Sequence, residues 1–443
     1  MIGALSYALD ITEGQPMGHA ARSCLIGMRI AEAIGLPEAA SRSLFYALLM
    51  KDVGCSSNAA RLSALFDGDD LAIKHDFKLA DSESLIEMAR YTARHAASDR
   101  GALARARRFA AIAARTEANT RRLIEIRCER GAEIARMVGL DEAAAEAIGC
   151  LDEHWNGGGH PLGLRGDGIP LLGRILCLAQ TVEVFYSARG HAVAYEVAAA
   201  RSGTWFDPAL VDALSSFRGE AGFWLRVAGP DPAREVARED PGAPDLPGDD
   251  SGLDLIAEGF ARVIDAKTPY TARHSEGVAR IAVGIATELG FDACELSDLR
   301  RAALLHDIGK LGVSNRILDK PGRLDDEEWK AVRRHPEFTL RILERVPVFE
   351  SLAELAANHH ERMDGRGYHR GLLAGELPLA HRVLVVADVF EALTATRPYR
   401  AGMPVEKALD IVHGDIGTAF CPEAAAGLDA WLDRAGDGWA LAA

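Results

Sequence analysis

Apolar positions along the chain recur at spacings of three and four residues, the period of amphipathic helices. Residues 326–346 and 380–396 show this period, and the alanine-rich stretch 85–140 favours helix by propensity. Alternation of apolar and polar residues at the period of a strand is scarce. The pattern therefore predicts an all-α fold. In residues 253–268 one helical face carries Leu255, Ile256, Phe260, Val263 and Ile264.

The pattern breaks at residues 229–252, which hold five prolines and seven acidic residues but almost no large apolar side chain. Such a composition predicts an exposed linker. The linker would divide the chain into two helical domains, residues 1–228 and residues 253–443. A total of 443 residues is consistent with two or three domains, because a domain typically has about 100–150 residues.

The two predicted domains look like copies of one framework. His19 and Asp52 are 33 positions apart, as are His274 and Asp307, and residues 153–185 match residues 361–393 without a gap. The offset between the copies is 255 residues in the first block and 208 in the second. The N-terminal copy therefore carries 47 additional residues, which we place in a helical insertion around 68–126.

The C-terminal copy contains an ordered series of metal-capable side chains. Five imidazoles and two carboxylates can hold two metal ions and leave positions open for water and substrate. The adjacent pairs in this series follow apolar helical runs, where a helix end lets two neighbouring side chains diverge. The series predicts a two-metal hydrolase. Its members are His274, His306, Asp307, His335, His359, His360 and Asp388.

Most of these side chains are replaced in the N-terminal copy. His19 and Asp52 remain, but Lys51 stands at the position of His306 and Arg127 at that of His335. A lysine or arginine cation at a metal position replaces the metal instead of binding it. Leu151, Asp152 and Gln180 take the remaining positions. The sequence therefore predicts no metal in the N-terminal copy.

Composition limits the setting of this chemistry. Seven cysteines without a CxxC pair suit a reduced cytoplasmic protein. Apolar runs such as 383–387 are too short to span a bilayer, and the N-terminus shows no secretory signal, so we expect no membrane segment. A net charge of −15 argues against binding of a nucleic-acid polymer. It leaves room for a small phosphorylated ligand.

The segments ALLHDIGKLGVSNRIL, HHERMDGRGY and ADVFEALTATRPYR together resemble the HD-GYP family, the cyclic-di-GMP phosphodiesterase branch of the HD hydrolases. The resemblance covers residues 253–443, and residues 1–228 resemble the same family in degenerate form. It implies two tandem HD-type helical domains, of which the C-terminal one is catalytic.

The resemblance also implies how the side chains are used. Asp307 would bridge two divalent transition-metal ions, of which Fe or Mn is favoured and Ni, Co and Zn remain open. The first ion would also be held by His274, His306 and Asp388, and the second by His335, His359 and His360. A hydroxide activated by both metals would attack the phosphodiester of cyclic di-GMP, giving pGpG and, as an open second step, GMP. Lys310 would contact a substrate phosphate beside Asp307.

Three arginines are further candidates for substrate contacts: Arg366 in the DGRGY segment, and Arg397 and Arg400 in RPYR. A guanidinium group offers a planar fork to a phosphate or to the edge of a guanine. The competing interpretation is structural, in which each arginine pairs with an acidic neighbour.

The sequence departs from the family pattern at three places. His369 stands where the GYP signature has proline, so the loop loses one fixed φ angle. Tyr270 stands where some members carry a glutamate that holds a third metal, so two metals are expected. Cys421 replaces the aspartate of an FDP motif, and we expect it to be a packed residue.

Two alternatives stay open at the level of function. One is an HD hydrolase of another cyclic dinucleotide or nucleotide, and the other is a receptor that binds a dinucleotide without hydrolysing it. The N-terminal copy is either a scaffold or a regulatory domain that binds a ligand or partner, or forms a homodimer.

Overall fold

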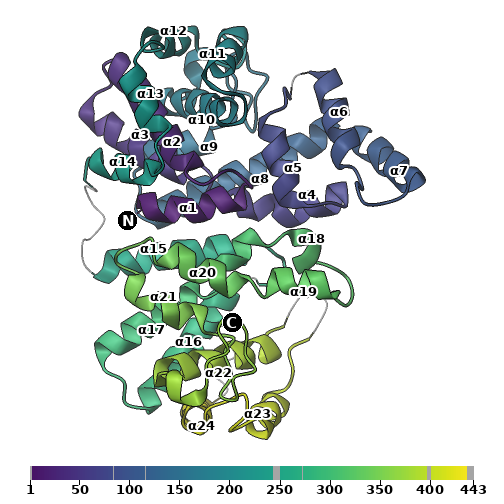
Figure 1. Ribbon diagram of the computed structural model, residues 1–443, viewed down its shortest axis with the longest axis vertical. Helices are drawn as coiled ribbons and strands as arrows, with labels where there is room; N and C mark the ends of the chain where they lie inside the picture. Colours follow the sequence, from purple (N-terminus) through teal and green to yellow (C-terminus); the bar gives the residue numbers. More distant parts are fainter. Residues whose placement is uncertain are drawn as a thin grey trace. The chain divides into compact units, whose positions relative to one another are not determined.

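The computed structural model describes residues 2–82, 84–114, 116–242, 250–271, 273–396 and 401–436. This part of the chain is built from helices and turns, with three isolated β-bridges and no β-strand (Figure 1). The predicted all-α fold is confirmed.

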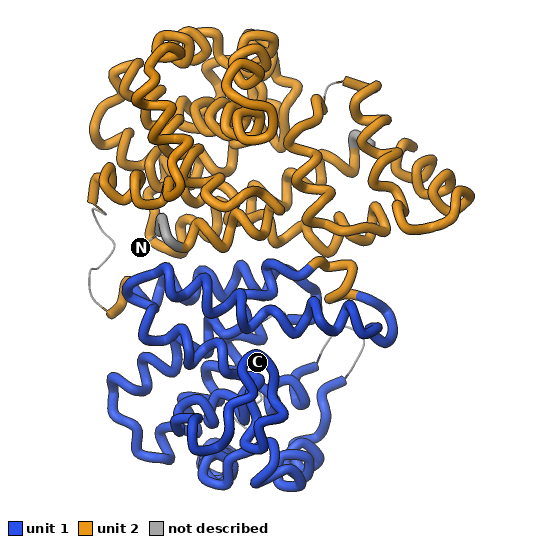
Figure 2. The backbone as a smooth tube through the Cα atoms, viewed as in Figure 1, with its two compact units in different colours: residues 1, 253–313, 320–443 blue, residues 2–252, 314–319 orange. Residues whose placement is uncertain are grey.

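The described chain divides into two compact units (Figure 2). The N-terminal unit comprises residues 2–252 together with 314–319, and the C-terminal unit comprises residues 253–313 and 320–443. We propose that these units are the two domains expected from the sequence, residues 1–228 and 253–443.

The N-terminal unit is centred on α2, which packs against α3 and α10. All three helices bury long apolar faces, and α10 is buried over most of its length. The helices of this half of the chain are α1 (Ile2–Thr12), α2 (His19–Ala33), α3 (Glu38–Met50), η1 (Cys55–Asn58), α4 (Ala59–Phe66), α5 (Asp70–Lys78), α6 (Leu85–His95), α7 (Ala102–Ala113), α8 (Thr116–Met137), α9 (Glu142–Gly149), η2 (Gly166–Gly168), α10 (Leu171–Arg189), α11 (His191–Ala200), α12 (Pro208–Ser216), α13 (Ala221–Val227) and α14 (Pro232–Arg238).

The C-terminal unit repeats this arrangement around α16, which packs against α17, α22 and α24. The helices of the second half of the chain are α15 (Asp250–Asp265), α16 (His274–Glu288), α17 (Ala293–Leu305), η3 (Ile308–Gly312), α18 (Asn315–Leu318), α19 (Asp326–Val332), α20 (His335–Leu343), α21 (Glu350–Ala357), η4 (Ala374–Glu376), α22 (Leu379–Thr394), α23 (Val405–Gly414) and α24 (Pro422–Ala435).

Local sequence sets the ends of the helices that carry the candidate site. Asp292 caps α17 in a reciprocal capping box with Glu295, and α22 begins directly after Pro378. The helical period over 326–346 does not form one helix. It is divided into α19 and α20, because Pro336 lies in the first turn of α20, where its missing N–H is tolerated.

The insertion expected around 68–126 is helical. It comprises α5, α6, α7 and the beginning of α8, and its apolar side chains form one cluster with Leu62 and Phe66 of α4. In that cluster the ring of Tyr91 contacts Phe66 and Phe77 edge to face, at centroid distances of 5.6 and 5.7 Å. The 47 additional residues thus form a small packed layer of the N-terminal unit.

The segment predicted as a linker, residues 229–252, is not extended throughout. Helix α14 lies inside it, with Pro232 and Val236 buried against the N-terminal unit. Asp231 caps this helix by accepting from the N–H of Arg234. The compositional rule missed α14 because one buried valine and one buried proline suffice to anchor two turns. We propose that the connecting segment starts after Asp240.

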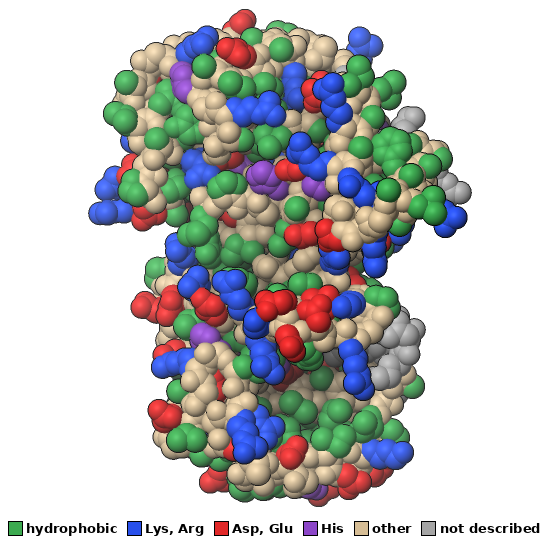
Figure 3. All heavy atoms as spheres, turned by 45° about the vertical axis from the view of Figure 1, so that its right-hand side comes forward, with side chains coloured by type: hydrophobic (Ala, Val, Ile, Leu, Met, Phe, Trp, Pro, Cys, Tyr) green, Lys and Arg blue, Asp and Glu red, His purple; other side chains and the backbone are tan. Residues whose placement is uncertain are grey.

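Side-chain charge is mixed over the surface. On the face drawn in Figure 3, acidic and basic side chains are interspersed, and the described residues form no continuous basic surface there. Among the described residues, only α10 is long and apolar enough to span a membrane by length and composition. Seventy-two per cent of that window is buried inside the protein, as in the core helix of a globular domain.

Candidate metal centre

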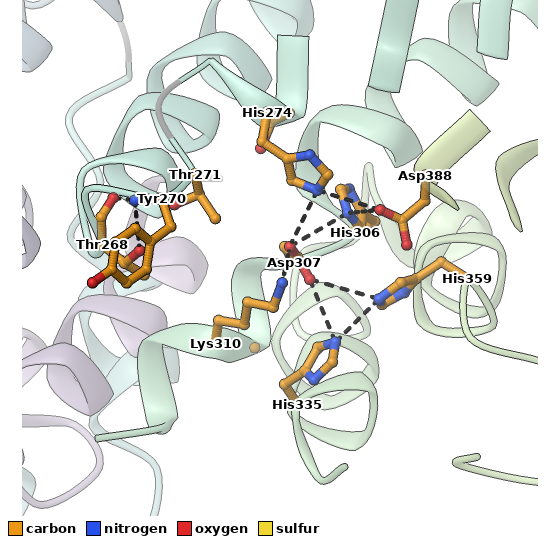
Figure 4. Close-up of polar contacts among 12 residues, drawn as sticks. Thr268, Tyr270, Thr271, His274, His306, Asp307, Lys310, His335, His359 and Asp388 are labelled. Carbon is orange, nitrogen blue, oxygen red and sulfur yellow. Dashed lines mark hydrogen bonds and ion pairs between the residues drawn. The ribbon is translucent and has the colours of Figure 1, made fainter. Parts of the chain in front are cut away.

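The seven candidate ligands lie at helix ends and on one helix face of the C-terminal unit, where the structure brings them together. All of them except His360 are labelled in Figure 4. His274 begins α16, His335 begins α20, and Asp388 lies within α22. The other four follow helix ends: His306 and Asp307 come after α17, and His359 and His360 come after α21.

The carboxylate of Asp307 separates the cluster into two groups. Its Oδ2 lies 3.6 Å from Nε2 of His274 and 3.5 Å from Nε2 of His306. Its Oδ1 lies 3.4 Å from Nε2 of His335 and 3.6 Å from Nε2 of His359. One carboxylate thus faces two sets of imidazoles with its two oxygens, which is the geometry of a bridging ligand (Figure 4).

Asp388 and His360 complete the two groups. Oδ1 of Asp388 lies 3.3 Å from Nε2 of His274 and 3.8 Å from Nε2 of His306. Three ligand atoms from His335, His359 and His360 lie within 4.8 Å of one another, as do three from His274, His306 and Asp388.

Hydrogen bonds at Nδ1, the ring nitrogen that faces away from the cluster, orient three of the imidazoles. In His306, His335 and His359 this atom lies 2.7 Å from the carbonyl oxygen three residues earlier, that of Ala303, Val332 or Ala356. A carbonyl can only accept, so each Nδ1 carries the proton and donates. Each Nε2 then directs its lone pair at the centre of the cluster, as a metal ligand must.

Electrostatics favour the neutral form that ligation requires at His306, His335 and His360. At His274 burial acts in the same direction, but hydrogen bonds to Asp388 and Glu391 raise the pKa to about 10. Burial lowers the pKa of His306 to about 4 and that of His335 to about 3, so both rings are neutral. Burial also holds the pKa of His360 well below its ordinary value. For Asp307 burial acts in the opposite direction, but Lys310 and His306 hold its pKa well below the usual range.

Two buried atoms at the centre fit a metal ion. Nε2 of His306 and Oδ1 of Asp307 have no hydrogen-bond partner among the described residues. A buried acceptor without a donor costs about 1–3 kcal/mol, so an arrangement with two of them needs compensation. A cation between the two groups would satisfy both atoms, and the mixed imidazole and carboxylate set suits a divalent transition metal.

Lys310 is the one candidate substrate contact that reaches the cluster. Its Nζ lies 2.5 Å from Oδ2 of Asp307, and its side chain is 22% exposed. Arg366 is exposed in the loop after α21, and its backbone N–H donates to Asp364. Arg397 and Arg400 lie outside the described residues.

The three departures from the family pattern have distinct structures. His369 has φ of +105°, a backbone angle that the ring of proline cannot adopt, so the loop differs from one with proline there. Tyr270 lies beside Thr268 and Thr271, apart from the ligand cluster (Figure 4). Cys421 is buried at the start of α24, and its thiol donates to Glu423.

Two glutamates that support the site were missed in the sequence. Glu391 accepts a short hydrogen bond from Nδ1 of His274, and Glu361 accepts from the backbone N–H groups of 370–372 in the loop. Both have identical counterparts in the N-terminal copy. Glu183 binds His19, and Glu153 accepts from the N–H groups of 162–164. Identity between the repeats at non-ligand positions was the signal that could have found them.

The N-terminal copy holds ammonium groups where the C-terminal copy gathers imidazoles. Nζ of Lys51 lies 2.8 Å from Nε2 of His19 and donates a short bond to Oδ2 of Asp52. Nζ of Lys78 lies 2.9 Å from Oδ1 of Asp52 and 2.9 Å from Oε2 of Glu13. Asp52 therefore bridges two lysines. Because Lys78 lies between Glu13 and Asp52, the acidic group that these residues form with Cys55 is already neutralised.

Comparisons with known proteins agree with the repeat. A protein-family model described as an HD domain matches residues 83–210 and 258–423, more than half of the chain. The chain is 44% identical over 425 residues to the 3'3'-cGAMP-specific phosphodiesterase 3 of Vibrio cholerae, covering 96% of this chain and 92% of that relative. It is 41% identical over 155 residues to a cyclic di-GMP phosphodiesterase of Thermotoga maritima, covering 34% of this chain and 42% of that relative.

A solved structure is similar to this chain over nearly its whole length. The crystal structure of the V. cholerae cyclic GMP-AMP specific phosphodiesterase V-cGAP3 aligns with a TM-score of 0.66 and 40% sequence identity. The alignment covers 99% of this chain and 98% of that one, so it includes both units.

Proposed function

Because the chain belongs to the HD-GYP family of HD-domain phosphodiesterases, we propose that it hydrolyses a phosphodiester of a cyclic dinucleotide at the cluster around Asp307. One observation carries the proposal: the two oxygens of Asp307 face two separate sets of imidazoles, at 3.4–3.6 Å. Two-metal phosphoesterases need such a shared ligand between their ions.

We assign two divalent metal ions to this cluster. The first would be held by His274, His306, Asp307 and Asp388, and the second by Asp307, His335, His359 and His360. When bound, the ions supply Lewis acidity for the attack of water on phosphorus. Fe or Mn is favoured, and Ni, Co or Zn also suits this donor set.

The chain's own residues position and neutralise the substrate. Lys310 extends past Asp307, so its ammonium group can donate to a non-bridging phosphate oxygen and balance the charge that grows there. The carbonyls behind His306, His335 and His359 fix the rings before substrate arrives. Glu361 ties down the loop that carries Arg366, whose exposed guanidinium is a second phosphate or guanine contact. Arg397 and Arg400 remain candidates for the same role.

The preferred substrate is 3'3'-cGAMP, because the relative with that specificity matches both units over 96% of this chain. Cyclic di-GMP, the substrate expected from the sequence motifs, is the second candidate. It is favoured by relatives such as that of T. maritima, which matches 34% of this chain. Both substrates place a purine on a 3'-5' phosphodiester, so the same metal centre serves either.

Metal content and turnover test the proposal together. The wild type and the His306→Ala/Asp307→Ala variant are analysed for bound metals and assayed with 3'3'-cGAMP and cyclic di-GMP. About two metals per chain and turnover of at least one substrate, both lost in the variant, are expected. Metal without turnover of either dinucleotide would contradict the proposed substrate class, and absence of metal would contradict the metal centre.

The seven cysteines all lie in the described part of the chain and are free thiols, which supports a reducing, cytoplasmic setting.

The N-terminal unit is proposed to regulate the catalytic unit. Removing residues 1–228 and finding a soluble protein with unchanged turnover would exclude regulation. Formation of a homodimer stays a prediction.

A further inference from the structure

The N-terminal unit contains a cavity of about 380 Å³ beside its lysine-filled site. Its walls come from α5, α6, α8 and α10, from the loop at 152–160, and from Trp205. Every lining residue belongs to the N-terminal unit. The volume lies within the range of small-molecule sites, about 300–1,000 Å³.

The cavity occupies the position that the catalytic centre has in the other copy. By the offset of 208 residues, its lining residues Arg127, Gln180 and His160 correspond to His335, Asp388 and Tyr368. The loops at both places are tied down in the same way, by Glu153 in one copy and Glu361 in the other. The N-terminal unit thus keeps a cleft at the substrate position although its ligands have been replaced.

The two sides of the cavity differ in chemistry. One side is apolar and includes Phe77 and Met88, next to the rim formed by Trp205. The indole of Trp205 is held rigidly, stacked on His154 at a centroid distance of 4.1 Å and covered by the guanidinium of Arg201 at 3.9 Å. The faces of the indole are thereby covered, and the wall of Phe77 and Met88 is the surface that suits a flat heterocycle.

The opposite side is polar and cationic. Lys78 and Arg127 line it together with Asp152 and the amide of Gln180, whose oxygen accepts from Nζ of Lys78. Nη2 of Arg127 pairs with Asp152, but its buried Nε has no hydrogen-bond partner among the described residues. A phosphate oxygen would satisfy this donor, and an amide can read the edge of a base.

We propose that this cavity is a non-catalytic binding site for a purine nucleotide. The base lies along the apolar wall, and its phosphate lies against Arg127. Lys51 and Lys78 occupy the places around Asp52 that metals need, so the ligand is bound and not hydrolysed. Only the choice of a nucleotide as ligand rests on the proposed function. The ligand is either the cyclic dinucleotide substrate or a linear product, which share the same chemistry.

Binding to the full chain, treated with chelator to stop hydrolysis, tests this site. Isothermal titration uses 3'3'-cGAMP, cyclic di-GMP, and GMP as separate probes. In Thr181→Trp the new side chain fills the cavity from α10, whereas Ala188→Trp places the same side chain on the exposed part of that helix. We expect one binding event of at least one probe to be lost in Thr181→Trp and kept in Ala188→Trp. Identical binding in both variants would overturn the proposal.

A second variant tests the site even if the Thr181→Trp protein does not fold. Gln180→Met keeps the side-chain length but removes the amide, and we expect it to weaken the same binding event about tenfold. Unchanged affinity in this variant would also overturn the proposal. The titrations with the dinucleotides show whether the substrate binds, and the titration with GMP shows whether the product binds. Nucleotide binding here without any turnover would contradict the proposed function alone, and normal turnover without this binding event would contradict the cavity alone.

Discussion

Lys310 lies three residues after Asp307 and differs from the seven ligands in its task. It donates to Asp307, yet an ammonium group cannot ligate a cation, so its removal separates metal binding from transition-state stabilisation. We expect Lys310→Met to keep about two metals and to lower turnover about 10²–10³-fold, the usual effect of losing one charge-stabilising donor. Elemental analysis and initial rates measure the two quantities.

The matched control for this prediction is Lys320→Met. Lys320 pairs with Glu328 on the surface, 33% exposed, and contacts none of the seven candidate ligands in the described structure. Turnover should be unchanged in this variant. A Lys310→Met protein that loses its metals would assign the lysine a structural role instead.

His19 provides a prediction about pH. Burial and the charge of Lys51 lower its pKa to about 4, with Glu183, Asp52 and Lys78 as the other charged groups around the ring. An unfolded histidine titrates near about 6.5, so unfolding takes up a proton between pH ~4 and ~6.5. The stability from this group is therefore present above pH ~6.5 and is lost as the pH falls through 4.

The expected loss between pH 7 and pH 5 is about 2 kcal/mol of unfolding free energy. Urea unfolding of wild type and His19→Gln at the two pH values measures it. The variant is less stable at pH 7, because it loses bonds to Lys51 and Glu183, but its stability should fall less toward pH 5. Equal pH slopes in the two proteins would show that His19 is already protonated in the fold.

At the scale of helices, α10 and α22 perform the same positioning task in the two copies. Each presents a buried glutamate, Glu183 or Glu391, to Nδ1 of the histidine that begins the facing helix. Only in the C-terminal copy does that histidine belong to a metal-capable cluster. We expect Glu391→Gln to weaken metal affinity about 10–100-fold, measured by titration with a competing chelator.

Glu183→Gln is the control, because Glu183 is also buried and also pairs with Nδ1 of a histidine. It should destabilise the N-terminal unit without changing metal affinity. If both variants lost metal equally, the effect of Glu391→Gln would come from general destabilisation and not from orientation of His274.

The elements show what can be predicted from sequence and what cannot. Ligand types and their spacing were sufficient to find the seven clustered side chains, since the HD pair follows an apolar run that ends as helix α17. The spacing of the ligands does not reveal which residues hydrogen-bond to a ligand or to the neighbouring loop, so Glu391 and Glu361 were missed. Lys78 was missed for another reason: it lies in the insertion, which has no counterpart in the C-terminal copy to compare it with.

Glycine positions illustrate the same limit. A Cβ at Gly309 would lie 1.9 Å from the carbonyl oxygen of His335, and one at Gly54 would lie 2.0 Å from that of Arg127. These close approaches let the short helix η3 pack against α20 and its counterpart η1 pack against α8. The HDxGK motif contains the glycine, but the close approach that requires it becomes evident only in the fold.

For the whole molecule, the repeat implies that metal stabilises one unit and not the other. The C-terminal unit leaves buried acceptors on His306 and Asp307 that a cation would satisfy, whereas Lys51 and Lys78 already neutralise Asp52. A ligand that binds only the folded state adds about 2.7 kcal/mol at a concentration 100-fold above its Kd. Chelation should therefore lower the stability of the C-terminal unit by an amount of this order and leave the N-terminal unit unchanged.

Hydrogen exchange followed by mass spectrometry, with and without chelator, resolves the two units within the full chain. After chelation, faster exchange is expected in α16, α17, α20 and α22, and unchanged exchange in α2, α3 and α10. The N-terminal unit serves as the internal standard, because equivalent helices of the two copies are compared in one sample. Faster exchange in α2 and α3 as well would mean that lysine has not replaced the metals, or that the two units unfold together. The Lys51→Met variant separates these outcomes. If the ammonium group of Lys51 stabilises the N-terminal unit, that unit loses protection from exchange in the variant.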